Sequence, residues 1–290
     1  MEQQFPFFST HRMPANSAMP VAAEIINQVI GVAFESSSLP LGILGVSPPV
    51  SGVSQYPYVL DTMATQGLIQ SRAFSLDLRG IDNPHGSIIF GGIDTGKYIG
   101  ALAKLPMLSP EQSPGGADRY YVTMTGVGVT LPDGKIDKTD ALSVPVFLDS
   151  GTTITSLPTP IYLAFTAFFP GGYRDPQTDD YIVPCTLKEL AGSIDFYFGT
   201  KTIRVSLNDF IWETQGICVL GVVPEDTEPT LGDTFLRAAY VVCDQDNRNI
   251  HLAQAAECGT NLVAIGSGPD AVPSSAGQCS APPMPTAKAD

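Results

Sequence analysis

The sequence predicts an all-β protein, and three observations support this class. Only 15% of the 290 residues are charged, while 28 glycines and 25 prolines supply many turn positions. β-Branched and aromatic residues recur in short runs between these turns, which is typical of strands. With 43% apolar side chains, the chain can bury a sizeable core as one large domain or two modest ones.

The elements follow in chain order. Residues 1–24 mix Pro, Ser, Met and polar types without periodicity, so we expect a disordered lead-in. Regular structure should begin near Ile25. The expected strands are residues 29–34, 41–46, 74–78, 87–90 and 120–124.

Two segments favour short helices. Residues 58–67 carry apolar side chains at helical spacing, and residues 158–168 begin with prolines suited to a helix N-terminus. After Gln254 the chain becomes rich in Gly, Ser, Ala and Pro. We therefore expect residues 258–290 to be a Pro/Ser/Ala-rich tail outside the fold.

The charge balance limits the partners. A net charge of -14 disfavours nucleic acid and anionic membrane surfaces. The longest apolar run, residues 161–169, ends at Pro170 and is shorter than the roughly 18 to 20 residues of a membrane helix. Residues 1–6 lack the basic start and apolar run of a signal peptide. Either the protein is cytosolic or its true beginning lies upstream.

The five cysteines have no C-x-x-C spacing, which argues against a zinc ribbon or a thioredoxin-like site. Cys185 and Cys218 each close a segment flanked by strand-like runs. A bridge between them would stabilise the fold by roughly 3 to 4 kcal/mol and would imply an oxidising compartment. The pairing of Cys258 and Cys279 stays open, and Cys243 is expected to be a buried free thiol.

The sharpest local signal lies after the apolar run 144–148. This run leads directly into Asp149, Ser150, Gly151, Thr152 and Thr153. An aspartate at the end of an apolar strand is partly desolvated, and Gly151 allows a tight turn that aims amides and hydroxyls back at the carboxylate. An ordinary β-turn is the alternative, because Asp and Gly are favoured turn residues.

The pattern apolar-apolar-Asp-Ser-Gly-Thr-Thr, followed by Leu157-Pro158 and a short helix, resembles the second active-site loop of pepsin-like aspartic proteases. The segments 42–45, 66–76, 86–92 and 231–242 resemble other parts of that family in order and spacing, over roughly residues 27 to 256. The interval from Cys185 to Cys218 is similar to the secreted fungal candidapepsin and yapsin branch.

The resemblance implies a bilobal, pepsin-like all-β fold. Residues 25–116 would be a remnant of the N-terminal lobe with the inter-lobe strands, and residues 117–257 a complete C-terminal lobe. It also implies a polypeptide substrate, no metal and no cofactor, and pepstatin-type inhibitors if a complete site forms. A full-length family member would be secreted, at the cell surface or vacuolar.

The resemblance also assigns roles within the loop. Asp149 matches a catalytic aspartate, Gly151 a backbone contact to substrate, Thr152 a brace between two active-site loops, and Thr153 a residue lining the cleft. Ser150 completes the loop. The family mechanism needs two aspartates that share one proton and hold a water between them.

A partner loop is not evident in the sequence. The other Asp-Thr-Gly is Asp94-Thr95-Gly96, but Lys97 follows where the family has Ser or Thr. Its distance of 149 - 94 = 55 residues from Asp149 is too short for an intervening lobe. Three explanations remain: a fragment of a working enzyme, an inactive homologue or peptide-binding module, and a homodimer that pairs two copies of Asp149.

Other hydrolase classes fit poorly. The sequence contains neither G-x-S-x-G nor H-E-x-x-H, the motifs of common serine and metal hydrolases. The three histidines, His11, His85 and His251, lie in turn-like or terminal contexts. Acid chemistry at Asp149 is therefore the leading hypothesis.

Overall fold

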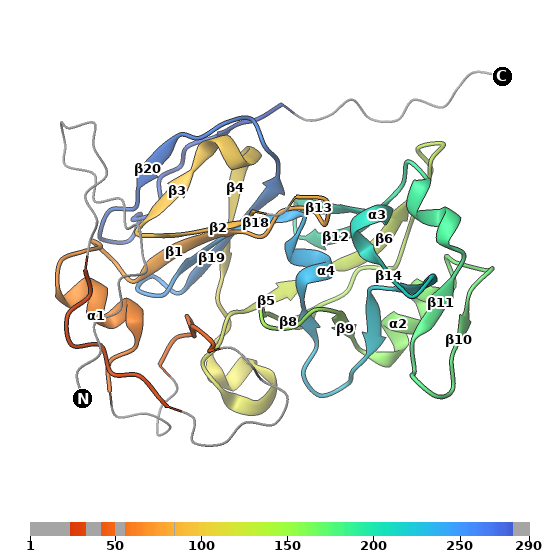
Figure 1. Cartoon of the computed structure of the whole chain (residues 1–290), viewed down its shortest axis with the longest axis horizontal. Coiled ribbons are helices and arrows are strands. Elements are labelled where there is room, and N and C mark those ends of the chain that lie inside the picture. Colours follow the sequence, from red (N-terminus) through yellow and green to blue (C-terminus); the bar gives the residue numbers. More distant parts are fainter. Residues whose placement is uncertain (1–23, 33–41, 50–55, 84, 281–290) are drawn as a thin grey trace.

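The computed structural model describes residues 24–32, 42–49, 56–83 and 85–280. Strands dominate these ranges (Figure 1), and the predicted all-β class is confirmed. The helices are α1 Val59–Thr65, α2 Thr159–Thr166, α3 Leu207–Phe210 and α4 Asp233–Leu236, with 3-10 turns η1 Thr95–Lys97, η2 Pro110–Gln112, η3 Pro114–Gly116 and η4 Cys185–Glu189. The strands are β1 Ala73–Asp77, β2 Ser87–Phe90, β3 Gly92–Asp94, β4 Tyr98–Pro106, β5 Tyr121–Met124, β6 Gly126–Thr130, β7 Ile136–Lys138, β8 Val144–Leu148, β9 Thr155–Leu157, β10 Tyr173–Arg174, β11 Tyr181–Val183, β12 Ser193–Phe198, β13 Lys201–Ser206, β14 Ile211–Thr214, β15 Ile217–Leu220, β16 Val222–Pro224, β17 Thr230–Leu231, β18 Ala239–Asp244, β19 Asn249–Ala255, β20 Leu262–Ala264 and β21 Gly277–Gln278.

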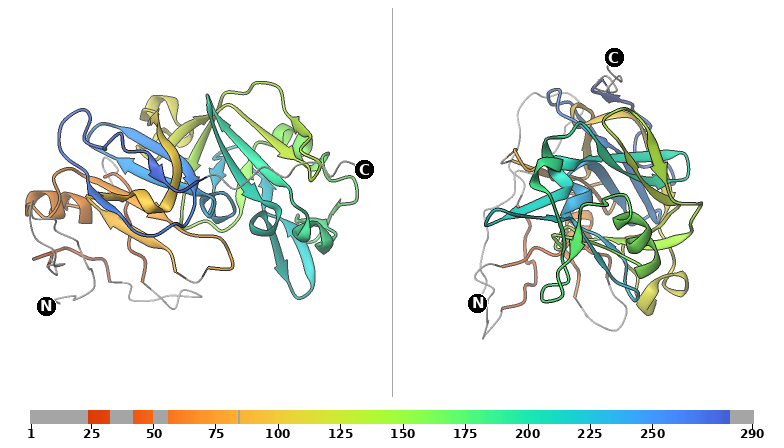
Figure 2. Two further views of the ribbon diagram at one scale, coloured as in Figure 1. Left: turned by 90° about the horizontal axis from the view of Figure 1, so that it is seen from above. Right: turned by 90° about the vertical axis from the view of Figure 1, so that its right-hand side faces the viewer.

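Two groups of strands lie side by side, with α4 between them (Figure 1). The first group contains the six-stranded sheet β2-β1-β18-β19-β4-β21 and the pair β20-β3. The second contains the sheets β13-β12-β6-β7, β10-β11-β15-β14 and β16-β9-β17-β8-β5. Figure 2 shows the same two groups from above and from one end. The fold is therefore bilobal, as the resemblance implied.

The six-stranded sheet joins distant parts of the chain. β18 pairs antiparallel with β1, and β19 pairs antiparallel with β4. Strands from residues 239–255 thus complete a sheet that begins near residue 73. Because this sheet crosses the boundary at residue 117, the division into residues 25–116 and 117–257 stays a prediction about sequence segments.

The last described segment, residues 257–280, is called the C-terminal strap below. Its strands β20 and β21 pair with β3 and β4, a disulfide joins Cys258 to Cys279, and Ile265 and Val272 are buried. The prediction that residues 258–290 lie outside the fold is therefore wrong for residues 258–280. Pairing with the edges of β3 and β4 and the disulfide stabilise this segment, although it has few apolar side chains. Residues 281–290 lie outside the described ranges.

The other predicted elements divide into two sets. The strands at 74–78, 87–90 and 120–124 are confirmed as β1, β2 and β5, and the two helices as α1 and α2. The prediction of a strand at 41–46 is wrong for residues 42–46, and residues 29–32 also form no strand. A strand needs a neighbouring edge to pair with, and Ile43 is instead 82% exposed. Residues 1–23, 33–34 and 41 lie outside the described ranges.

The remaining cysteines lie in the second group of strands and in β18. Cys185 and Cys218 form a disulfide with a Cα–Cα distance of 5.2 Å, which links η4 to β15. Cys243 is free and buried, and burial raises the pKa of its thiol well above the usual range. Within the described ranges, no helix has the length and apolar character needed to cross a bilayer.

Candidate active site

The strand β8 carries Asp149 to an edge of the core. Val146 and Leu148 are buried, and β8 lies between β5, which runs antiparallel to it, and β17, which runs parallel. The Asp149 N–H donates to the carbonyl oxygen of Leu231 at 3.2 Å. The last hydrogen bonds of the sheet thus fix the backbone of Asp149, as the sequence pattern suggested.

The turn after β8 holds the Asp149 carboxylate. Gly151 N–H donates to Oδ1 at 2.9 Å, and the Thr152 hydroxyl donates to Oδ2 at 2.9 Å. A Cβ atom on Gly151 would lie only 3.2 Å from Oδ1. The two hydrogen bonds fix the orientation of the carboxylate at the end of β8.

The loop is open to solvent. Ser150, Gly151 and Thr153 are exposed, while Asp149 and Thr152 are partly buried. The five residues that the sequence singled out therefore lie together, with one carboxylate accessible from outside. Such a group can bind a water molecule or a peptide carbonyl, and can act as a general base or acid.

The helix α4 forms backbone hydrogen bonds to this loop. Asp233 N–H donates to Thr152 O at 2.8 Å, and Thr234 N–H donates to Thr153 O at 3.1 Å. A Cβ atom on Gly232 would lie 2.4 Å from Thr152 O, so only glycine fits at this contact. Gly232 falls within the segment 231–242 named above, but nothing in the local sequence indicated that it lies against the Asp149 loop.

Asp233 is a second carboxylate close to the loop. Burial raises the pKa of Asp233, nearby Arg237 lowers it, and the charge of Asp149 raises it further. Arg237 Nη2 lies 3.7 Å from Asp233 Oδ2. The sequence signal for Asp233 was its position directly after Gly232, at the start of a helix.

Asp94 lies in the first group of strands and is 2% exposed. Its Oδ1 accepts hydrogen bonds from Gly96 N–H at 2.9 Å and from Asn261 N–H at 2.7 Å. These bonds join η1 to the C-terminal strap. The surroundings of Asp94 explain it as a structural residue, in agreement with its rejection from sequence.

A possible metal cluster is ruled out by its covalent chemistry. Cys185, Glu213 and Cys218 place three candidate ligand atoms within 4.8 Å of one another in the described part of the chain. The two sulfur atoms are joined in a disulfide, so neither can act as a thiolate ligand.

The chain is similar to known fungal proteins. A family profile described as eukaryotic aspartyl protease matches residues 22–255. "Probable aspartic-type endopeptidase opsB" of Aspergillus fumigatus is 34% identical over 267 residues, covering 86% of this chain and 54% of that protein. "Aspartic proteinase MKC7" of Saccharomyces cerevisiae is 37% identical over 251 residues, covering 77% of this chain and 41% of that protein.

Two further comparisons agree. "Aspartic proteinase yapsin-3" of Saccharomyces cerevisiae is 34% identical over 242 residues, covering 77% of this chain and 47% of that protein. The chain thus spans about half the length of the curated relatives it matches. The crystal structure of an aspartic proteinase from Irpex lacteus matches with a TM-score of 0.66 and 23% identity, covering 82% of this chain and 75% of that chain, which supports the fold.

Proposed function

This chain belongs to the eukaryotic aspartyl protease family, and we propose from that membership that it is an aspartic-type endopeptidase with Asp149 as one of its two catalytic acids. The observation that carries the proposal is the Asp149 carboxylate at the end of β8, held by Gly151 N–H and the Thr152 hydroxyl. The proposed substrates are polypeptides.

The proposed chemistry assigns each loop residue a task. Asp149 and the partner acid share one proton: the ionised carboxylate takes a proton from the water that attacks the scissile carbonyl, and the protonated one gives its proton to the carbonyl oxygen. The C–N bond then breaks as the carboxyl group that took the water's proton passes it to the leaving nitrogen. Thr152 and the Gly151 N–H orient the carboxylate, and exposed Thr153 and the Gly151 backbone contact the substrate. Ser150 completes the turn. No metal and no cofactor takes part in this proposal.

The reaction needs a second carboxylate opposite Asp149, because two like charges that share one proton create both the base and the acid. The relatives are longer than this chain, which covers 54% of the Aspergillus fumigatus protein. We propose that a polypeptide segment beyond the given sequence supplies the partner aspartate. A second copy of this chain, presenting its own Asp149, is the alternative source.

A second candidate function is a peptide-binding homologue without activity. The observation that favours it concerns the other Asp-Thr-Gly loop of the given sequence, Asp94-Thr95-Gly96. Asp94 and Thr95 are buried in the first group of strands, so this loop does not supply a second accessible carboxylate. Such a protein would bind an extended peptide along the Asp149 loop without cleaving it.

The proposed location follows from the disulfides. Cys185–Cys218 and Cys258–Cys279 suit an oxidising compartment. We therefore propose a secreted or cell-surface protein.

The test is cleavage of a denatured protein at about pH 3 to 5, where an aspartate dyad works. The native gene product containing these residues is compared with its Asp149→Asn variant, each with and without pepstatin. We expect pepstatin-sensitive cleavage that falls by at least about 100-fold in the variant. No cleavage by a folded product would overturn the proposal and favour the binding homologue.

A further inference from the structure

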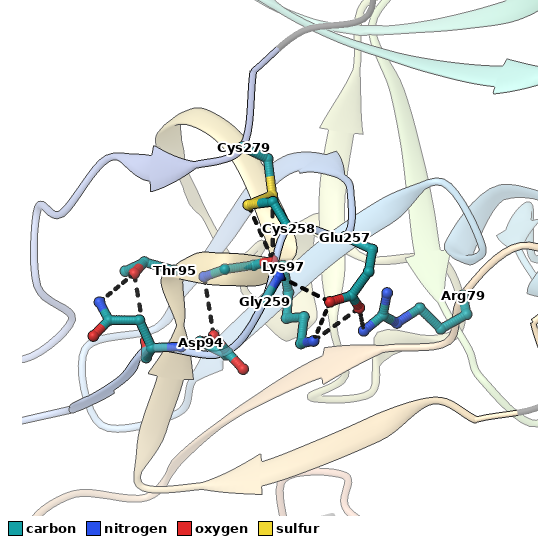
Figure 3. The surroundings of a disulfide bond; sticks show 10 residues. Arg79, Asp94, Thr95, Lys97, Glu257, Cys258, Gly259 and Cys279 are labelled. Atoms are coloured by element: carbon teal, nitrogen blue, oxygen red, sulfur yellow. Dashed lines mark hydrogen bonds and ion pairs between the residues drawn. A yellow bond between two sulfur atoms is a disulfide. The ribbon is translucent and has the colours of Figure 1, made fainter.

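Arg79, Lys97 and Glu257 form a network of charged side chains in the first group of strands and the strap (Figure 3). Arg79 follows β1 and its side chain is 11% exposed. Its Nε lies 2.6 Å from Asp77 Oδ2, and its Nη2 pairs with Glu257 Oε2. The Arg79 side chain is thus fixed from two sides, by β1 and by the C-terminal strap.

Glu257 belongs to the strap, beyond the match to the family profile, which ends at residue 255. Both of its carboxylate oxygens lie 2.8 Å from Lys97 Nζ. The next residue is Cys258, whose disulfide to Cys279 closes the strap over η1 (Figure 3). The strap therefore holds Glu257 in place against Arg79.

The backbone of Arg79 adopts an unusual conformation. Its φ is 71°, in the left-handed region that side-chain-bearing residues avoid. The two ion pairs of the Arg79 side chain oppose relaxation to an ordinary backbone conformation. Releasing the side chain would allow the Arg79 carbonyl to move.

That carbonyl leads toward the candidate active site. Arg237 Nη1 donates to Arg79 O at 3.4 Å, and Arg237 Nη2 lies 3.7 Å from Asp233 Oδ2. The Asp233 N–H bonds to Thr152 O at 2.8 Å. The Thr152 hydroxyl in turn holds Asp149 Oδ2 at 2.9 Å.

We infer that Glu257 and Arg79 are positioning residues for the Asp149 loop, acting through Arg237 and Asp233. The strap fixes Arg79, the Arg79 carbonyl fixes the guanidinium of Arg237, and Arg237 sets the charge balance at Asp233 beside the loop. The word positioning rests on the proposed function, because it assumes that Asp149 is catalytic. The series of contacts that leads from Glu257 through Arg79 and Arg237 to Asp233 does not depend on that assumption.

A carboxyl titration tests this inference without any cleavage assay. The pKa of Asp233 is measured by carbon-detected NMR in the full chain and in its Glu257→Gln variant. Arg237 lowers the pKa of Asp233, so loss of its alignment should raise that pKa by roughly 0.2 to 0.7, the size expected for a partly exposed ion pair. Removing the Glu257 charge at a distance has the opposite sign, so a rise cannot be a long-range charge effect.

The matched control is Asp270→Asn, which removes one negative charge from the same strap at its ion pair with Lys104. We expect it to leave the pKa of Asp233 unchanged or slightly lower. Arg237→Gln should give the full rise, and the double variant Glu257→Gln with Arg237→Gln should match Arg237→Gln alone. If Glu257→Gln does not fold, Arg79→Lys serves, because a lysine lacks the fork that pairs with both carboxylates.

An unchanged or lowered Asp233 pKa in Glu257→Gln, or additive effects in the double variant, would overturn the inference. A raised Asp233 pKa, together with no cleavage by the folded native gene product, would refute the proposed function and leave the connection between strap and loop intact. The two hypotheses therefore fail in different experiments.

Discussion

The loops at Asp94 and Asp149 share one local hydrogen bond and differ in their surroundings. In both, Oδ1 of the aspartate accepts a hydrogen bond at 2.9 Å from the N–H of the glycine two residues later. Asp94 is 2% exposed and also accepts a hydrogen bond from the strap, whereas Ser150, Gly151 and Thr153 are exposed. The Asp-x-Gly sequence gives the same hydrogen bond in both loops, and the surrounding structure decides whether the loop is buried or exposed.

The glycines show the same difference. A Cβ atom on Gly96 would lie 2.4 Å from Gly259 O in the strap, and the sulfurs of Cys258 and Cys279 lie 3.5 and 3.2 Å from Gly96 O. A Cβ atom on Gly151 would meet only the Asp149 carboxylate. The Asp94 loop is covered by protein, whereas part of the Asp149 loop is exposed.

The largest expected effect on stability is at Asp94. Asp94→Ala leaves the N–H groups of Gly96 and Asn261 without their acceptor, and we expect a loss of about 3 to 5 kcal/mol in unfolding free energy. Asp149→Ala should cost less than about 1 kcal/mol, because water replaces its bonds. Urea denaturation measures the unfolding free energy of both variants. Equal losses in the two would contradict the distinction between a structural Asp94 and an exposed Asp149 loop.

The next effect concerns the strap disulfide. Replacing Cys258 and Cys279 together by serine should lower the unfolding free energy by about 3 kcal/mol, as expected for a loop of this length. The loop at Asp149 is connected to the strap through Arg79, Arg237 and Asp233, and it should change less than the strap itself. Amide hydrogen exchange should become clearly faster at Asn261 and change less at Gly151; the reverse order would contradict this account.

The third effect is a pH dependence near the Asp94 loop. Burial raises the pKa of Asp77 from 3.8 to about 6, which Arg79 and Lys97 oppose and Glu257 increases. The folded protein thus binds this proton more tightly than the unfolded chain. The contribution of protonated Asp77 to the free energy of unfolding is fully present below about pH 3.8 and is lost as the pH rises through about 6.

This loss should amount to about 2 to 3 kcal/mol. Urea denaturation at pH 4 and pH 7 should show it in the wild-type chain, and the Asp77→Asn variant should reduce it. If the variant and the wild-type chain change equally with pH, another group is responsible.

The smallest expected effect on stability is at Thr152. Thr152→Val removes the hydroxyl that donates to Asp149 Oδ2 and should cost at most about 1 kcal/mol of stability. If the proposed function holds, cleavage should fall by about tenfold or more. Thr152→Ser keeps the hydroxyl and should retain most of the activity; equal losses in both variants would argue for a packing role.

Local patterns in the sequence predicted the Asp149 loop better than they predicted the residues that pack against it. The apolar run before Asp149 and Gly151 after it were enough to expect the turn, because strand and turn preferences are local. Asp233 and Gly232 lie more than 80 residues away, and only the tertiary structure brings them to Thr152. The strap was missed because composition hides strands whose stability comes from pairing with β3 and β4 and from one disulfide.

The strand predicted at residues 41–46 does not form over residues 42–46, because local preference was not enough to make it. Its apolar residues favour a strand, yet pairing needs a partner edge, and the exposed Ile43 has none among the described residues. Local preference alone did not settle its structure. Val46 is held instead through its carbonyl, which accepts a hydrogen bond from the Tyr120 hydroxyl at 2.5 Å.

The central claim is that the two loops have opposite roles, catalytic at Asp149 and structural at Asp94. The most direct measurement is pepstatin-sensitive cleavage per folded molecule at about pH 4, for Asp149→Asn and Asp94→Asn in the native gene product. We predict that cleavage is lost in Asp149→Asn, which stays as stable as the wild type, and is kept by the folded fraction of Asp94→Asn. Retained cleavage in Asp149→Asn, or its loss in fully folded Asp94→Asn, would contradict the claim.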